Sequence, residues 1–275
     1  MKSKKQIIGI LLMLLATAVT RSFAQTNEMA SLFSDFEARA SSGTPRDVAE
    51  ATQELERLTQ VSRESVTEVL PVILKETSNP HLSVRRLAAS ALYQITTRLD
   101  GQALLSTETA TFTALLTDTD IPIRRISILA VDTLRLNPSS SLVPVLETYL
   151  ARQDAVSTIG AATATVLMKI APNNVGSINA VVQFMKRQDH TSASREDLLN
   201  GIRYAKSNNR EIGKEVARYA DDPNEQTSVH AIETLQLMGK STILDSQPSL
   251  SRIAADTSRA PSVRTAATKA LSAVQ

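Results

Sequence analysis

A single pattern of apolar positions recurs along most of the chain. With Val84 as position zero, small or apolar side chains follow at positions +4, +7, +8 and +11, which are Ala88, Ala91, Leu92 and Ile95. Side chains at this spacing share one face of an α-helix, because the helix has 3.6 residues per turn. The pattern therefore predicts a helix with one buried stripe.

The same pattern, in stronger or weaker form, starts at six other positions. They are Asp47, Ile123, Ile159, Ser194, Thr227 and Val263, and successive starts lie 33 to 39 residues apart. Second apolar segments separate these helices, at 29–40, 62–77, 104–116, 142–152, 175–186, 210–220 and 249–256. Pro71 and Pro144 fall inside two of those segments and predict kinks, since proline removes a backbone donor.

Each period therefore predicts a helical hairpin, and no alternating run of strand type occurs in the sequence. One hairpin cannot bury its apolar stripe alone, whereas stacked hairpins bury a continuous core. The sequence predicts an all-α fold, an α-solenoid (superhelix) of about seven helix-hairpin repeats.

The repeats resemble the HEAT family. Leu70-Pro71 within the first helix, Asn79-Pro80 in the turn and Val84-Arg85 at the start of the second helix carry this resemblance. Thr117-Asp118 with Ile123-Arg124, and Ser262-Val263-Arg264, repeat parts of it. The short periods are similar to those of the compact bacterial HEAT-like repeats, including the repeats named after phycobilin lyases.

The resemblance implies a polar ladder between adjacent repeats. In HEAT arrays a turn residue five positions before the start of the pattern pairs with an arginine one position after it. The turn residues are Asn79, Asp118, Asp154, Asp189 and Asp222. The arginines are Arg85, Arg124, Arg195 and Arg264. A charged ligand groove is the alternative interpretation, but a fixed offset in successive units favours a structural role.

The first 24 residues have the three parts of a secretory signal peptide. Lys2, Lys4 and Lys5 precede an apolar run, and Ser22-Phe23-Ala24 offers a cleavage site before Gln25. The run is shorter than the roughly 20 residues needed to span a bilayer, which disfavours an uncleaved anchor as the alternative. We expect a periplasmic or secreted repeat domain at 25–275, with no stable membrane insertion after cleavage near Ala24.

Cleavage also changes the charge of the chain. The segment 1–24 carries four basic residues and no acidic residue, so its removal takes the formal net charge from +2 to −2. Such a mature chain has no global attraction to nucleic acid. The absence of Trp and the scarcity of other aromatic residues also disfavour base-stacking surfaces.

The sequence offers little catalytic chemistry. It has no Cys, its three His residues lie far apart, and its glycines form no GxSxG, P-loop or GxGxxG motif. The carboxylate pairs Asp118/Asp120 and Asp221/Asp222 fall in turns, where acids cap helices. We therefore predict no catalytic residue, no metal site and no cofactor, and a chain that is not an enzyme.

The resemblance implies that the second helix of each repeat lines the concave face of the solenoid. Positions +2, +6 and +9 are opposite the buried stripe, so we expect them to face that groove. Arginine, tyrosine and apolar anchors are common in protein-contact hot spots. The candidate protein-binding residues are Arg86, Tyr93, Arg125, Leu129, Met168 and Arg203.

The sequence therefore favours an exported, non-catalytic scaffold or adaptor that binds a protein or peptide along its concave face. The alternative is an enzyme, or an accessory subunit of one, with lyase or hydrolase chemistry on a HEAT-like solenoid. A deep pocket with converging ionisable side chains would favour the enzyme, and a shallow continuous groove would favour the scaffold.

Overall fold

The computed structural model describes residues 73–97, 108–134, 140–152 and 157–274. It also describes these separate residues: Asp35, Ala38, Arg39, Thr44, Arg46, Asp47, Glu50, Leu70, Pro71, Leu105 and Leu136. The predicted signal peptide at 1–24 and most of the repeat that starts at Asp47 lie outside the described residues.

The chain divides into two compact units, residues 1–104 and 105–275. In the first unit, α4 (Leu82–Thr96) follows a turn in which the Asn79 side chain accepts a hydrogen bond from the His81 amide at 2.9 Å. This helix buries Val84, Leu92 and Ile95, all of which belong to the predicted stripe.

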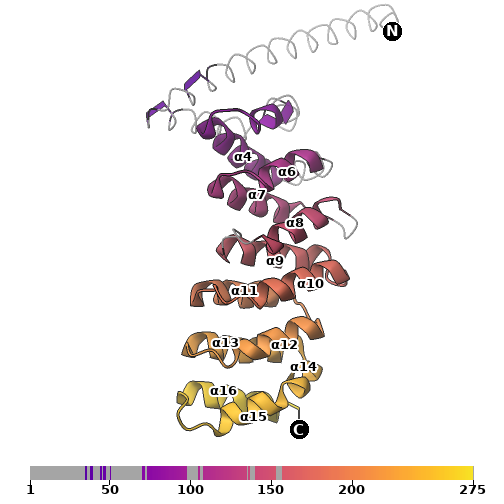
Figure 1. Cartoon of the computed structure of the whole chain (residues 1–275), viewed down its shortest axis with the longest axis vertical. Helices are drawn as coiled ribbons and strands as arrows, with labels where there is room; N and C mark the ends of the chain where they lie inside the picture. The colour runs from indigo at the N-terminus through magenta and orange to yellow at the C-terminus, as the bar shows by residue number, and fades with distance from the viewer. Residues whose placement is uncertain are drawn as a thin grey trace, which may run out of the picture. The chain divides into compact units, whose positions relative to one another are not determined.

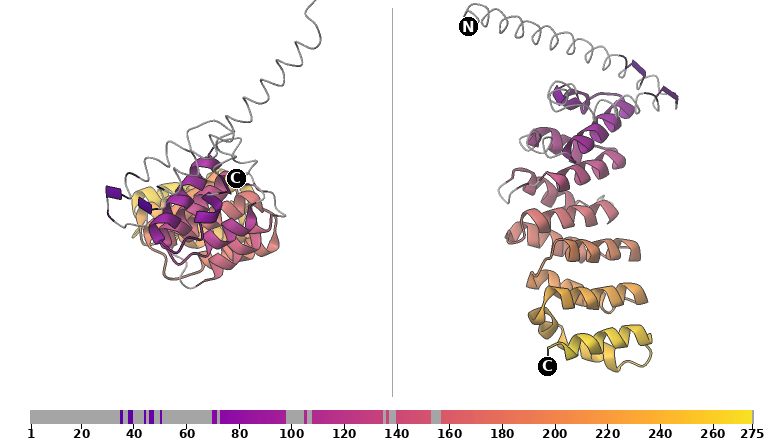
Figure 2. Two further views of the ribbon diagram at one scale, coloured as in Figure 1. Left: turned by 90° about the horizontal axis from the view of Figure 1, so that it is seen from above. Right: turned by 180° about the vertical axis from the view of Figure 1, so that it is seen from behind.

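The second unit consists of stacked helical hairpins arranged in two layers (Figures 1 and 2). The A layer contains α6 (Thr109–Leu116), α8 (Leu142–Ala151), α10 (Val175–Met185), α12 (Arg210–Tyr219) and α15 (Gln247–Ala255). The B layer contains α7 (Ile121–Thr133), α9 (Ser157–Ile170), α11 (Ser192–Tyr204), α13 (Glu225–Met238) and α16 (Pro261–Ser272). Neighbouring B helices contact one another along the layer, and α7, α9, α13 and α16 also contact the A helix of their own hairpin.

This arrangement confirms the predicted all-α solenoid of helical hairpins, and no strand occurs among the described residues. The core lies between the two layers. Phe112 and Leu146 of the A layer and Ile123 and Ile128 of the B layer are each at most 1% exposed. Burying one such side chain contributes about 1.5–3 kcal/mol to stability. Because stacked hairpins bury these side chains together, each hairpin depends on its neighbours for stability.

Short polar side chains set where the B helices begin. Asp120, Thr191 and Asn224 each lie three residues before the start of the repeated pattern, and each is an N-cap. Their side chains accept hydrogen bonds from the amides of Ile123, Ser194 and Thr227, respectively, at 3.0–3.2 Å. Such caps satisfy amides that have no partner within the helix.

Two features differ from the sequence-based expectation. Pro144 is the third residue of α8 and therefore lies in its first turn, where amides make no intrahelical hydrogen bond, so it need not kink the helix. A short extra helix, α14 (Lys240–Asp245), also lies between α13 and α15. Arg210 of α12 holds it through two hydrogen bonds of 2.6 and 2.7 Å to the Asp245 carboxylate, and these bonds keep the pKa of Asp245 below its ordinary value.

None of the described helices combines the length and the apolar character that crossing a membrane requires.

Candidate binding groove

A groove of about 470 Å³ lies on the exposed face of the B layer, over α7, α9 and α11. Its apolar lining includes Ile128, Leu129, Ile159, Ala162 and Val166. Its polar lining consists of Arg125, Asp132, Thr158, Thr165, Asp197, Asn200 and Tyr204. The volume is in the range of sites that hold small ligands or a few side chains of a partner. We call this feature the B-face groove.

Apolar and aromatic side chains are unusually exposed in this groove. Leu129 is 41% exposed and Tyr204 is 66% exposed, although both belong to helices whose other faces are buried. A scattered exposed leucine needs no explanation, but an aromatic and a leucine lining one hollow are typical of a contact surface.

Side chains from three helices connect along one edge of the groove. Lys169 of α9 forms an ion pair with Asp132 of α7. The same ammonium lies 4.8 Å from the ring centroid of Tyr204 in α11, within cation–π distance. This edge is therefore held in place by contacts between successive repeats.

Two of the six predicted binding residues line the groove, and four do not. Arg125 and Leu129 are exposed at its α7 side, whereas Met168 is only 4% exposed. The prediction for Met168 is wrong because α9 is rotated by about one residue relative to the expected register. Its side chains at 158, 162, 165 and 169 are turned outward, and Met168 packs into the core.

A close contact holds α9 against α10 at Gly160. A Cβ at that position would lie 2.1 Å from Cζ of Phe184, so the buried Phe184 ring of α10 occupies the space of the missing side chain. Side-chain packing of this kind, which the apolar period does not record, contributes to how α9 sits in the layer.

The other predicted binding residues lie elsewhere. Arg86 is exposed and Tyr93 is half-buried, and both belong to α4 in the first unit. Arg203 of α11 is partly exposed, and its Nη1 lies 3.8 Å from Oε2 of Glu233 in α13. Arg203 thus contributes to the packing of two B helices and does not line the groove.

One inter-repeat contact of the predicted polar ladder joins α11 to the turn before α13. Arg195 of α11 forms an ion pair with Asp222, in the turn before α13. The Asp222 side chain is 3% exposed and also accepts a hydrogen bond from the Asn224 amide at 2.8 Å. Arg195 lies 5.9 Å from the centroid of Tyr219, so the pair is covered by an aromatic ring.

Asp189 departs from the ladder geometry. Its carboxylate accepts hydrogen bonds of 2.9 and 2.5 Å from Arg187, two residues earlier in the same turn. These bonds hold the pKa of Asp189 below its ordinary value. The position one residue after Ile159 in the preceding repeat is Gly160, so that repeat has no arginine to offer. Arg187 reaches back instead and donates a 3.0 Å hydrogen bond to the carbonyl of Arg152.

Asp118 and Arg85 also have contacts within their own turns. Asp118 accepts a 2.8 Å hydrogen bond from the Asp120 amide, and Arg85 donates to the carbonyl of Asn79 at 3.0 Å. Arg124 is buried, 5.9 Å from the Tyr149 ring centroid, and Nε of Arg264 is buried without a hydrogen-bond partner among the described residues. Asp154 lies outside the described residues.

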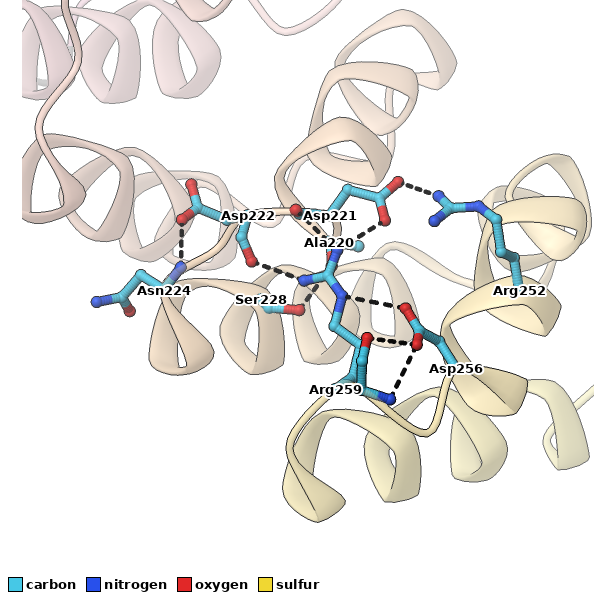
Figure 3. Close-up of polar contacts among 9 residues, drawn as sticks. Ala220, Asp221, Asp222, Asn224, Ser228, Arg252, Asp256 and Arg259 are labelled. Atoms are coloured by element: carbon cyan, nitrogen blue, oxygen red, sulfur yellow. Dashed lines mark hydrogen bonds and ion pairs between the residues drawn. The ribbon is translucent and has the colours of Figure 1, made fainter.

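A second inter-repeat cluster was not predicted from the sequence. Arg259, in the turn before α16, donates hydrogen bonds to the carbonyls of Asp221 and Asp222 at 3.0 and 2.9 Å (Figure 3). Arg252 of α15 pairs with the Asp221 carboxylate at 2.5 Å. These arginines lie outside the repeated offsets, so the repeat pattern contains no signal for them.

The histidines join helices and do not gather into a metal site. His190 is buried between α10 and α11, with 2.7 Å from Nε2 to the Phe184 carbonyl and 2.9 Å from Nδ1 to Oγ of Ser194. Burial lowers its pKa below the ordinary value. His230 of α13 contacts the Glu196 carboxylate of α11. Among the described residues no three His, Asp or Glu side chains form a cluster that could hold a metal ion.

No family model matches the chain, and no curated protein matches it. Among solved structures, an engineered protein determined by the Northeast Structural Genomics Consortium is 17% identical over 87% of this chain and 68% of its own, with a TM-score of 0.54. Two designed armadillo repeat proteins, one solved in complex with the peptide (KR)4, are each 12% identical over 87% of this chain and 98% of theirs, with TM-scores of 0.40 and 0.44. At these identities the likeness concerns the fold alone.

Proposed function

We propose that this chain is a non-catalytic binding scaffold that holds a segment of a partner protein in the B-face groove. The observation that carries the proposal is the composition of that groove, in which exposed Leu129 and Tyr204 stand beside an apolar floor and charges of both signs. Aromatic, leucine and arginine side chains around a desolvated floor are suited to anchoring a protein segment.

The charges of the groove favour binding over catalysis. Arg125 and Asp197 belong to α7 and α11, two helices that flank α9, and Asp132 is engaged by Lys169. A general acid and base must both reach one reacting atom within hydrogen-bonding distance. Charges on flanking helices are better suited to contacting separate parts of an extended ligand.

Crosslinking from inside the groove tests this function. The chain contains no Cys, so Thr165→Cys introduces one attachment point for a photoreactive group in the groove, and Thr148→Cys introduces a matched one on α8 of the A layer. Both threonines donate to the carbonyl four residues earlier, so the two substitutions remove equivalent bonds.

We expect a single partner protein to be crosslinked from position 165 and not from position 148, and to be lost when Leu129→Asp is added. Equal crosslinking from both positions, or none from position 165, would contradict a groove-bound partner. A bound segment recovered in cleaved or shortened form would instead support the enzymatic alternative.

We also propose that the repeats are of the HEAT type and that the protein works outside the cytoplasm of a bacterium. The three-part N-terminal pattern at 1–24 supports export, and Val-Arg at the start of the second helices supports the HEAT assignment. We expect full-length chain expressed in a bacterium with two membranes to appear in the periplasmic fraction with Gln25 as its first residue, as measured by intact mass. A membrane-bound product of full mass would contradict cleavage.

A further inference from the structure

The lining of the B-face groove is arranged in rows that cross the three B helices. Lys169 contacts both Asp132 and Tyr204, so one row crosses the three helices there, and the lining residues about one and two turns earlier form parallel rows, because the helices run in the same direction (Figure 2). The first row is Arg125, Ala162 and Asp197, and the second is Leu129, Thr165 and Asn200. The third row is Asp132, Lys169 and Tyr204, the edge described above.

The first and third rows both contain charged side chains, but they differ in whether those side chains have a partner. In the third row Lys169 engages both of its neighbours. In the first row the exposed side chains of Arg125 and Asp197 make no hydrogen bond or ion pair with any part of the chain that the structure describes. Ala162 lies between them on α9 and adds no charge. The first row therefore presents an unpaired cation at one end and an unpaired carboxylate at the other.

The negative end of this row continues beyond the groove. A second hollow of about 500 Å³ on α13 and the start of α16 is lined by Glu225, Glu233 and His230. Along the first row the exposed charge thus changes from basic at α7 to acidic at α11, and Glu225 and Glu233 add carboxylates on α13, where Glu233 lies near Arg203. A ligand that lies along the rows experiences opposite potentials at its two ends.

The spacing of the helices limits the length of such a ligand. Neighbouring packed helices have axes about 8–10 Å apart, so two steps, from α7 to α11, span roughly 16–20 Å. An extended peptide covers about 3.3–3.6 Å per residue, so roughly five or six residues bridge this span. The apolar floor at Ile159, Ala162 and Val166 lies between the two ends.

Given the proposed binding function, we infer that the B-face groove takes an extended peptide segment of a partner protein with charges of opposite sign at its two ends. An acidic residue of the segment pairs with Arg125, a basic residue about five or six positions away pairs with Asp197, and an apolar side chain between them rests on the α9 floor. Complementary charge at both ends gives specificity, because a like charge at either end is repelled.

A charge-swap matrix tests the inference with defined probes. Four fluorescent peptides share one framework: Glu-Ser-Thr-Leu-Ser-Thr-Lys, its Glu/Glu and Lys/Lys versions, and a Gln/Gln version. Each is titrated into the full mature chain, Arg125→Glu, Asp197→Lys and the control Lys240→Glu, with fluorescence anisotropy as the readout. Lys240 is an exposed lysine of α14 away from the groove, so its reversal matches the net-charge change of Arg125→Glu.

We expect the unsubstituted chain and Lys240→Glu to prefer the mixed peptide by about threefold to tenfold, in line with one exposed charge pair per end. Arg125→Glu leaves two acidic ends and should prefer the Lys/Lys peptide, and Asp197→Lys should prefer the Glu/Glu peptide. Circular dichroism melts verify that each variant is folded.

Binding of all four peptides with the same ranking in every variant would overturn the charge assignment and leave the binding function intact. Binding of none of them to any variant would also overturn this inference, and the proposed function would then rest on the crosslinking experiment alone. The two proposals therefore fail in distinguishable ways.

Discussion

At the scale of single residues, one offset in the repeat serves two purposes. The side chains of Asn79, Asp118 and Asp222 all accept a hydrogen bond from the amide two residues later, which closes the turn before the B helix. At Asp222 an arginine from the preceding repeat, Arg195, also comes within reach and adds an ion pair between repeats. The turn bond needs no neighbouring repeat, because both of its partners lie in one turn.

Removing the charge of Asp222 separates these two purposes. Asp222→Asn keeps an oxygen for the Asn224 amide but weakens the contact with Arg195, whose partner carboxylate is 3% exposed. We expect a loss of about 1–3 kcal/mol in the free energy of unfolding, because the partly buried Arg195 guanidinium loses its charged partner. Urea unfolding measures this loss.

Asp189→Asn is the matched control for that prediction. The Asp189 side chain is 61% exposed and its arginine partner is two residues away, so we expect a change of at most about 1 kcal/mol. Equal losses for the two variants would argue against a special role for the contact between repeats.

His190 should make stability depend on pH. Its folded pKa is lowered by burial, whereas in the unfolded chain it titrates near its ordinary value of about 6.5. The unfolded state therefore binds the proton more readily, so the stabilisation is complete above that value and decreases as the pH falls towards the folded pKa.

The measurement is the melting temperature from pH 8 to pH 5. We expect His190→Gln to be less stable at pH 8, since two hydrogen bonds change, but to lose less stability on acidification than the unsubstituted chain. His81→Gln, at an exposed position, should leave the pH dependence as it was. Parallel curves for all three proteins would contradict the assignment to His190.

At the scale of helices, boundaries depend on local chemistry that the apolar period does not contain. Gly239 ends α13 and precedes α14, with a φ of 110° and a ψ of 175°. That conformation is accessible to glycine and strained for other residues. The sequence indicates a joint at Gly239, but the short helix that follows it has too few turns to produce a readable stripe.

Gly239→Ala isolates this backbone requirement. An added Cβ meets nothing within 4 Å, so any loss of stability comes from the backbone conformation alone. We expect a loss of about 1–3 kcal/mol in the free energy of unfolding, measured in urea. Gly176→Ala in α10 is the control at a helical position, where the added Cβ lies 3.0–3.2 Å from side-chain oxygens of Glu147 and Asn174 that must shift by a few tenths of an ångström. A loss at position 176 as large as that at 239 would point to a cause other than the positive φ.

At the scale of the whole second unit, the stability of each hairpin depends on its contacts with the neighbouring hairpins. Each B helix contacts only adjacent helices, so a local defect should weaken its surroundings and fade with distance along the stack. Gly160 is a suitable position, since a methyl group there would overlap the Phe184 ring.

We expect Gly160→Ala to lower the free energy of unfolding by about 1–3 kcal/mol through overpacking, although Ala is the better helix former. Hydrogen exchange should become faster in α8, α9, α10 and α11, which surround the site, and stay nearly unchanged in α15 and α16. A uniform rise in the exchange rate across the second unit would show instead that the unit unfolds as one cooperative unit.

The sequence by itself determined the all-α repeat architecture. A helix that buries one face needs apolar residues at a period of about 3.6, and this period can be read directly from the sequence. It also identified Arg125 and Leu129 as exposed on the B face. It could not decide the rotation of α9, which places Lys169 and not Met168 on that face. The rotation of a helix is set by its contacts with other helices, such as that of Phe184 with Gly160, and these are not written in the apolar period.

Tertiary structure alone also brought Arg125 and Asp197 into one groove. The two residues are far apart in sequence, and neither follows an offset that marks it as a partner of the other. Their proximity results from the stacking of three repeats, so the change of charge along the groove is a property of the assembled layer and is absent from any single repeat.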